Sequence, residues 1–465
     1  MTAFAAPPLP RARLRRIRPV LIVVASIAIV GGSYALNALR PAPVGNPVAP
    51  IAAAEQAPLA GPADAPVGGV AGIAAIDHAL KAWTANYARN SKDFLAATNI
   101  AMLYDARGRL TGDIGDYSRA QAAIGQALVA LPGYLTAEVL QARLLQTLHD
   151  FPGALAAAQA ILQKDPRVLQ ALATAGDAQL ELGDVKGAAK AFASLENQAP
   201  GPAVTARRSR LAYIQGDEAS AISLAQRAWD EATAAGQTGA SLGWYAYLAG
   251  VTAISTGSPE AALNWFQQAL GVWPDSYVAI AGEARAQAAL GHIDAAIAGY
   301  LRAIAIAPQP DALTALGDLY ALRGDAKLAA DQYATVEAIG HLAAINQQVY
   351  NRQLLLFSVN HGRDLATALT LAERELKDRH DVYGYDAYAW ALLANGRAAD
   401  ADAAMTKALA FGTRDALVLY HDGEIKLALG DGAAARTLLQ EALSIRGALD
   451  PLAASRAADS LATIR

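Results

Sequence analysis

Cysteine is absent from the 465-residue sequence. Without thiols the chain has no disulfide framework, thiol nucleophile, zinc-thiolate site or lipidated cysteine anchor. Aromatic residues make up only 6% of the chain, and β-branched residues are sparse outside residues 20–30, whereas alanine is abundant. Because alanine is the strongest helix former, this composition predicts an all-α protein.

A surplus of positive charge is also absent, since 38 Lys and Arg residues face 42 Asp and Glu residues, for a net charge of -4. Nucleic-acid binding depends on many basic residues neutralising phosphates, so we do not expect a nucleic-acid partner. The sequence contains no HExxH, GxxxxGK[ST], GxSxG or Asp-rich calcium-loop motif. We therefore expect no catalytic residue, metal ligand or cofactor, and no enzyme activity.

Charge is missing altogether from residues 19–39, PVLIVVASIAIVGGSYALNAL. This length matches the roughly 20 apolar residues that span a bilayer. The preceding segment is basic and contains Arg11, Arg13, Arg15, Arg16 and Arg18. Positive residues favour the cytoplasmic side, so we expect a single-pass protein of the cytoplasmic (inner) membrane with its body outside, periplasmic or extracellular. The alternative is a signal peptide with an apolar core at 20–32 and small residues for cleavage at 33–35.

These features predict the domain organisation. Residues 1–18 form a basic cytoplasmic tail, and residues 19–39 form the transmembrane anchor. Residues 40–72 are rich in Pro, Ala and Gly, carry almost no charge, and are typical of an extended linker. Residues 73–465 form the folded body, with a leading helix at 73–89 and a trailing helix at 449–465.

An alanine recurs in the body at intervals close to 34 residues. The positions are Ala120, Ala154, Ala188, Ala221, Ala262, Ala296, Ala329, Ala368, Ala401 and Ala435. Other positions keep the same register. Five residues before the alanine, a glycine able to end a helix is found at Gly115, Gly183, Gly216, Gly257, Gly291, Gly324, Gly396 and Gly430, with His149 and Arg363 as the exceptions.

The second helix of each copy has its own signals. A large side chain follows the alanine by four residues at Phe192, Phe266, Tyr300, Tyr333, Met405 and Leu439. A proline follows it by twelve residues at Pro132, Pro166, Pro200, Pro274 and Pro308, where a helix cannot continue. A small residue is expected where the first helix crosses the second, as at Gly176, Gly250, Gly317 and Gly423.

This period and this order of small, large and stop residues resemble the tetratricopeptide repeat (TPR) family over roughly residues 90–447. The resemblance implies an α-solenoid: a right-handed superhelix of about ten helix-turn-helix repeats, whose first helices line a concave groove. Extra residues fall at 107–116, 230–243 and 340–350, where we expect loops.

In TPR proteins, set positions of the first helix face bound peptides. Projected onto this sequence, they are Arg143, Asp177, Arg210, Tyr213, Trp244, Tyr247, Arg285, Asp318, Tyr383, Asp386, Trp390, Tyr420 and Glu424. Tyr, Trp and Arg are the residue types that anchor interfaces. The resemblance therefore implies a protein partner, bound as a peptide or helix in the groove.

Two alternatives stay open at this stage. The pairs His149-Asp150, His380-Asp381 and His421-Asp422 could serve a metal-dependent hydrolase, although they fall at different places in different repeats. The body could also be a self-associating structural module that forms a homo-oligomer. The favoured interpretation is a non-catalytic, membrane-tethered scaffold or adaptor that binds protein partners in the bacterial cell envelope and aids complex assembly.

Overall fold

The computed structural model describes residues 72–345 and 351–464. In this part of the chain every regular element is a helix, and all described residues belong to one compact unit. None of the described helices has the length and apolarity needed to cross a membrane. The predicted tail, anchor and nearly all of the linker, residues 1–71, lie outside the described residues.

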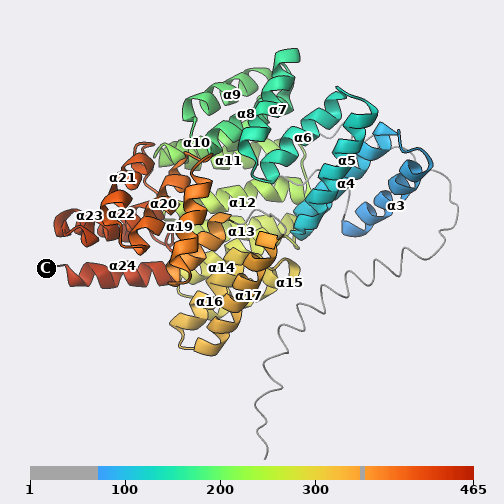
Figure 1. Ribbon diagram of the computed structural model, residues 1–465. Coiled ribbons are helices and arrows are strands. Elements are labelled where there is room, and N and C mark those ends of the chain that lie inside the picture. The colour runs from blue at the N-terminus through green and yellow to red at the C-terminus, as the bar shows by residue number, and fades with distance from the viewer. Residues whose placement is uncertain (1–71, 346–350, 465) are drawn as a thin grey trace, which may run out of the picture. The chain divides into compact units, whose positions relative to one another are not determined.

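Ten helical hairpins follow one another in the described part, with one further helix at each end (Figure 1). The leading helix is α3 (Ile73–Arg89) and the trailing helix is α24 (Pro451–Thr463). The hairpins are α4 (Phe94–Thr111) with α5 (Ile114–Ala130), α6 (Leu135–Thr147) with α7 (Phe151–Lys164), α8 (Leu169–Glu181) with α9 (Val185–Gln198), α10 (Pro202–Ile214) with α11 (Glu218–Ala234), α12 (Gly239–Ser255) with α13 (Pro259–Val272), α14 (Tyr277–Ala289) with α15 (Ile293–Ile306), α16 (Pro310–Leu322) with α17 (Ala326–Ile345), α18 (Asn351–Asn360) with α19 (Leu365–Glu375), α20 (Val382–Ala394) with α21 (Ala398–Leu409), and α22 (Ala416–Ala428) with α23 (Gly432–Ser444).

The predicted repeat register is confirmed by burial. All ten recurring alanines are at most 3% exposed, and each lies on the second helix of its hairpin. The large residues one turn later are buried too, and they fill the space beside the small residue of the first helix. A Cβ atom built on Gly317 would lie 2.4 Å from the ring of Tyr333, and one on Gly176 would lie 2.4 Å from the ring of Phe192. Only glycine leaves room for these rings.

The predicted helix ends are mostly confirmed. Second helices end two residues before Pro132, Pro166, Pro200, Pro274 and Pro308. Seven of the eight predicted glycines have positive φ angles, as a left-handed helix cap requires. His149, one of the exceptions, adopts the same conformation with a φ of 60°.

The prediction for Gly115 is wrong, because α4 ends at Thr111, before Gly115 is reached. Gly112 has the left-handed conformation, with a φ of 69°, and Gly115 lies inside α5. The expected loop at 107–116 is correspondingly reduced to two residues between the helices. The helix continues because Arg107 is buried and its guanidinium donates to both carboxylate oxygens of Asp116 at 2.7 Å.

The other two insertions also lengthen helices. In the region 230–243, α11 continues to Ala234 and α12 already begins at Gly239, so the expected long loop is wrong there. In the region 340–350, α17 continues to Ile345, and residues 346–350 lie outside the described residues.

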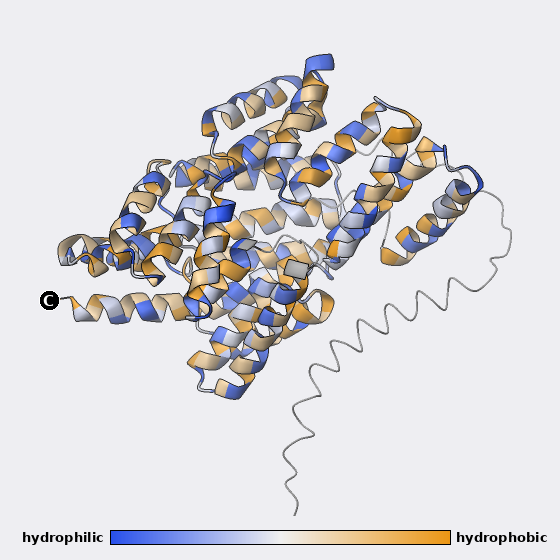
Figure 2. Cartoon of the chain, in the orientation of Figure 1, coloured by the Kyte–Doolittle hydropathy of each residue, from blue (hydrophilic) through white to orange (hydrophobic). Residues whose placement is uncertain are grey.

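Hydrophobic and hydrophilic residues alternate around each helix rather than separating into apolar and polar helices (Figure 2). Most helices therefore bury one face against neighbouring hairpins, as stacked repeats require. One buried cluster contains residues that are far apart in the sequence. It joins Phe192 and Ile214 to Val382 and Met405, nearly 200 residues away. The second half of the array must therefore contact the first half.

These contacts form a seam with a regular offset. The turn inside one hairpin lies against the loop that follows the hairpin five further along the chain. A Cβ on Gly183, in the α8–α9 turn, would meet the carbonyl oxygen of His380 at 2.2 Å, and one on Gly216 would meet that of Gly412 at 2.2 Å. In the next hairpin, Arg446 donates to Glu260 at 2.8 Å. The α4–α5 turn keeps the offset, since Gly112 lies beside Gln309.

Candidate functional site

A cavity of about 640 Å³ lies among the first helices of the hairpins. Helices α10, α12, α14, α16, α18 and α20 contribute most of the lining, and the starts of α22 and α24 complete it. Because the second half of the array returns to the first half along the seam, residues from both halves line this space. The cavity thus lies on the first-helix side of the array, the side on which the TPR resemblance implies a groove.

Five charged side chains line the cavity, and four of them are acidic. They are Asp311, Asp318, Asp415 and Asp450, with Arg285 as the single base. Arg285 uses one guanidinium nitrogen to donate to the carbonyl oxygen of Ala448 at 2.7 Å. The acidic residues come from three different elements, and no lysine lines the space.

Asp318 and Asp415 are held by protein donors. The hydroxyl of Tyr333 donates to Asp318 at 2.7 Å, and Nε2 of His361 lies 2.8 Å from the same carboxylate. The hydroxyl of Tyr213 donates to Asp415 at 2.8 Å, which joins α10 to the start of α22 across the seam. Tyr383 donates to the same oxygen at 3.3 Å.

The two tyrosines on Asp415 stay neutral. Burial raises the pKa of both hydroxyls, and the neighbouring Asp415 carboxylate raises it further. A neutral hydroxyl donates its proton to the carboxylate and adds no charge to the cavity. Asp415 also accepts from the backbone N–H of Leu417 at 2.9 Å, so it caps α22.

Three of the acidic residues converge near Tyr300. Burial raises the pKa of this tyrosine, and Asp450, Asp311 and Asp318 add to the effect while Arg285 opposes it. Burial also raises the pKa of Asp450.

Asp311 differs from the other three carboxylates. It lies in the first turn of α16 and faces the cavity with an exposed side chain. Among the residues that the structure describes, it forms no hydrogen bond or ion pair. Protein atoms of the cavity walls displace part of the water around the carboxylate, and this desolvation raises its pKa to about 6, although Arg285 acts in the opposite direction.

The projected groove residues divide between the cavity and the packing around it. Five of them line the cavity: Tyr213, Tyr247, Arg285, Asp318 and Tyr383. Trp244 lies beside Tyr247, with ring centroids 5.2 Å apart, but is not part of the lining.

Three further projected residues form ion pairs between neighbouring first helices. Arg143 pairs with the buried Asp105, Asp177 pairs with Arg207 at 2.9 Å, and Arg210 pairs with Glu181. Their charged groups are therefore already occupied by the protein itself.

The last four lie together near the C-terminal end of the array. Asp386 accepts a hydrogen bond from Nδ1 of the His421 ring at 2.8 Å, and Trp390 stacks on that ring with centroids 4.0 Å apart. Tyr420 lies 5.7 Å from Trp390, and burial raises the pKa of Glu424. The indole N–H of Trp390 also donates to Asn360 at 2.7 Å. This group packs α18, α20 and α22 together rather than lining the cavity.

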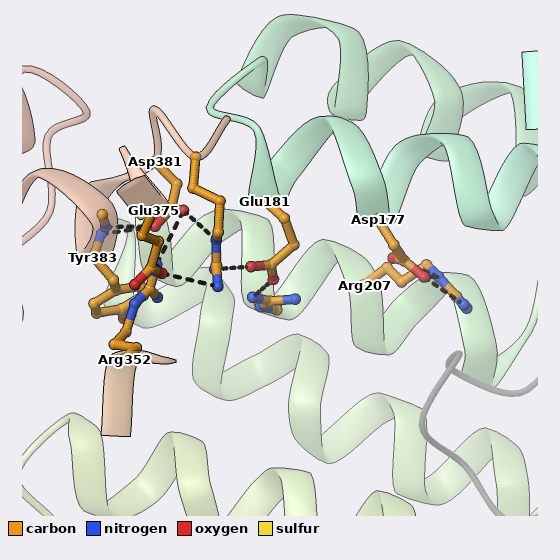
Figure 3. Close-up of polar contacts among 10 residues, drawn as sticks. Asp177, Glu181, Arg207, Arg352, Glu375, Asp381 and Tyr383 are labelled. Atoms are coloured by element: carbon orange, nitrogen blue, oxygen red, sulfur yellow. Dashed lines mark hydrogen bonds and ion pairs between the residues drawn. The ribbon is translucent and has the colours of Figure 1, made fainter. Parts of the chain in front are cut away.

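A second polar site joins the two halves of the array (Figure 3). Glu181, at the end of α8, accepts from Arg210 of α10 and from Arg379, which lies 198 positions further along the chain. Arg379 reaches Asp381 at 3.1 Å, and Arg352 reaches Glu375 at 2.6 Å. Burial opposes ionisation of Glu181, but Arg210 and Arg379 lower its pKa to about 2. The site is an ion-pair network that closes the seam.

The His-Asp pairs do not form a common site. His149 lies in the α6–α7 turn, His380 precedes α20, and His421 lies within α22. The partner of His421 is Asp386, not the adjacent Asp422. Within residues 72–345 and 351–464, no group of three or more His, Asp or Glu side chains is arranged to hold a metal ion.

Several cavity residues were missed by the projection from sequence. Asp311, Asp415 and Asp450 stand at or just inside the start of a helix, and Tyr277 and Tyr300 lie outside the four projected positions. Aspartate is common at helix starts because it caps the helix, so its presence there does not predict a cavity. Only the return of the chain along the seam brings these residues together.

Comparison with known families supports the repeat assignment. Residues 253–319, from the end of α12 to the last turn of α16, match a family model described as tetratricopeptide repeat. The same pairing of buried alanine, close-approach glycine and large residue recurs in hairpins outside this range. The chain carries tetratricopeptide repeats. No curated protein matches its sequence.

Several solved structures are similar to this chain at low identity. A human IFIT1 dimer with PPP-AAAA is 15% identical, over 80% of this chain and 86% of that chain, with a TM-score of 0.43. The APC/C hetero-tetramer Cut9-Hcn1 is 14% identical over 83% and 93%, with a TM-score of 0.36. A TPR protein from Parabacteroides merdae is 16% identical over 56% and 98%, with a TM-score of 0.31. Similarity at this level does not transfer a ligand or a partner.

Proposed function

We propose that this TPR protein is a non-catalytic scaffold that binds a protein partner in the bacterial cell envelope and is tethered to the membrane by residues 19–39. The observation that carries the binding role is the cavity on the first-helix side. A TPR array presents this side to extended or helical segments, since its repeats bury their other faces against one another.

The size of the cavity limits what it can bind. A volume of about 640 Å³ is within the range of small-ligand and peptide pockets, and it is far too small for a folded domain. Five tyrosines, Tyr213, Tyr247, Tyr277, Tyr300 and Tyr383, contribute to its lining. Tyrosine provides both apolar surface and a polar hydroxyl, so the cavity is suited to part of an extended segment of a partner.

The membrane tether is proposed from the sequence alone. Residues 19–39 carry no charge and follow five arginines, which favours a cytoplasmic N-terminus and an exported body. Protease added outside spheroplasts should digest the body, and protease added to inside-out vesicles should leave it intact. Digestion from the cytoplasmic side would contradict this part of the proposal without affecting the binding role.

The absence of native cysteine allows a clean test of the binding role. We expect a single Thr314→Cys variant, labelled with a photo-crosslinker, to crosslink a protein partner in the native membrane, because Thr314 lines the cavity. The matched control is Thr437→Cys on the exposed face of α23, outside the cavity.

A blocking variant completes the test. Thr314→Trp should reduce recovery of the crosslinked partner identified above, because the indole occupies cavity volume, whereas Thr437→Trp should not. Circular dichroism and thermal melting check that both variants fold. If folded Thr314→Trp protein recovers the partner as well as the wild type does, the cavity is not the binding site.

A further inference from the structure

We propose that the cavity receives the guanidinium or ammonium group of an Arg or Lys side chain, carried on an extended segment of the protein partner. This inference rests on the proposed function, since it names the chemistry of the segment that the same cavity binds.

The first argument is the charge of the lining. Four aspartates and one arginine line the cavity, and the two tyrosine hydroxyls on Asp415 are neutral donors. Arg285 directs one nitrogen to a backbone carbonyl. A cationic group entering this space meets a surplus of carboxylates, whereas a phosphate or carboxylate group would be repelled by them.

The second argument concerns Asp311, whose hydrogen-bonding capacity is unused by the described part of the chain. Asp318, Asp415 and Asp450 each accept at least one hydrogen bond from the protein, at distances of 2.7 to 2.8 Å. Asp311 accepts none. Ionising its carboxyl group also costs free energy, because the cavity walls partly desolvate the charge. A guanidinium or ammonium donor would supply both the missing hydrogen bonds and the compensating charge.

The third argument is the aromatic lining. Tyrosine rings attract cations through their faces, and five tyrosines line a space that also contains carboxylates. The aliphatic stem of an Arg or Lys side chain packs well on such rings, while its charged end reaches a carboxylate. Aromatic surface next to unpaired negative charge therefore fits a long basic side chain better than a short or purely apolar one.

The test measures binding of defined peptides to the full-length protein in nanodiscs by isothermal titration calorimetry. The probes are nine-residue Ala/Gly peptides with a central Arg or Lys, the same peptide with citrulline in place of Arg, and spermidine. Citrulline keeps the shape of arginine and removes its charge. We expect the Arg and Lys peptides to bind at least about tenfold more tightly than the citrulline peptide, as the loss of a charge-assisted hydrogen bond predicts.

Variants locate the effect. Asp311→Asn should weaken the Arg peptide by about tenfold or more and leave the citrulline peptide unchanged. Asp331→Asn, on the exposed side of α17, is the control and should change neither. Equal affinity for the Arg and citrulline peptides, or no effect of Asp311→Asn in folded protein, would overturn the proposal.

The outcomes separate this inference from the proposed function. If Thr314→Cys still crosslinks a partner but charge makes no difference to peptide binding, the scaffold role stands and the cationic occupant is wrong. If spermidine binds tightly and no peptide does, the cavity is a small-molecule site and the peptide occupant is wrong. If neither peptides nor partner depend on the cavity, both proposals fail.

Discussion

The surroundings of Asp311, rather than its residue type, set the pKa of its carboxyl group. Asp311 stands where many helices place an acidic residue, in the first turn, yet its pKa is raised to about 6 because cavity walls surround it. Arg285 of α14 opposes this shift. Besides the tyrosines, Asp318, His361, Asp415 and Asp450 are ionisable groups at or beside the cavity.

This shift predicts a pH dependence of stability. The folded protein holds a proton on Asp311 more tightly than the unfolded chain does, whose carboxyl has its ordinary pKa near 3.8. Wild-type stability should therefore fall as pH rises through 6 on account of this group. We expect the melting temperature of Asp311→Asn, relative to wild type, to rise between pH 5 and pH 7.5.

Asp331→Asn, measured in parallel, provides the baseline for that comparison. A constant difference between Asp311→Asn and wild type across this pH range would show that the carboxylate of Asp311 is not desolvated.

Other residues that share the projected groove positions serve packing instead. Trp390 donates to Asn360 and stacks on His421, so its truncation removes contacts between three helices. Position along a first helix predicts which side of the array a residue faces. It does not predict whether a neighbouring first helix covers that residue.

At the scale of the hairpin, the sequence specifies packing closely. The small residue of the first helix and the large residue of the second are about 16 positions apart, as for Gly317 and Tyr333, and they meet across one turn. Helix pairing of this kind depends only on residues that are close together in the sequence. The period, the helix ends and the ten hairpins were therefore predictable. The exceptions are the helices lengthened by insertions, because buried partners such as Asp116 for Arg107 extend them.

The hairpin contact predicts a contrast between two glycines. Gly317→Ala should destabilise the protein by about 1–3 kcal/mol, because its methyl group would overlap the Tyr333 ring. Gly125→Ala, in α5 with no atom within 4 Å of the new Cβ, should stabilise it by about 0.5–1 kcal/mol.

Urea denaturation of both variants tests this. If Gly317→Ala is as stable as wild type, the first and second helices of that hairpin are further apart than the structure has them.

At the scale of the whole described array, the contact between its two halves decides the architecture. The turns of the first, third, fourth and fifth hairpins each meet a loop five hairpins later, and the ion-pair network around Glu181 reinforces this contact. The carboxylate of Glu181 is ionised well below its usual pKa of 4.5, so its contribution to stability should be lost as pH falls from 4.5 towards 2.

Removing the charge of the Glu181 carboxylate should weaken the contact between the two halves of the array. Glu181→Gln leaves Arg379 and Arg210 without their shared anion, and a broken buried pair of this kind costs about 3–5 kcal/mol. We expect a lower melting temperature and a larger radius of gyration by small-angle X-ray scattering, with helicity by circular dichroism unchanged.

Glu373→Gln, on the exposed side of α19, is the matched control. Scattering and melting curves identical to those of this control would mean that the two halves of the array are held together without Glu181.

The sequence by itself determined the repeats: their period, their number and the residues that pack each helix pair, because these interactions join residues within one or two copies. Only the tertiary structure decided the cavity and the seam, which join residues such as Tyr213 and Asp415 that are 202 positions apart. The reason is geometric. A small rotation between neighbouring hairpins adds up over the array, and only its sum determines which distant surfaces meet.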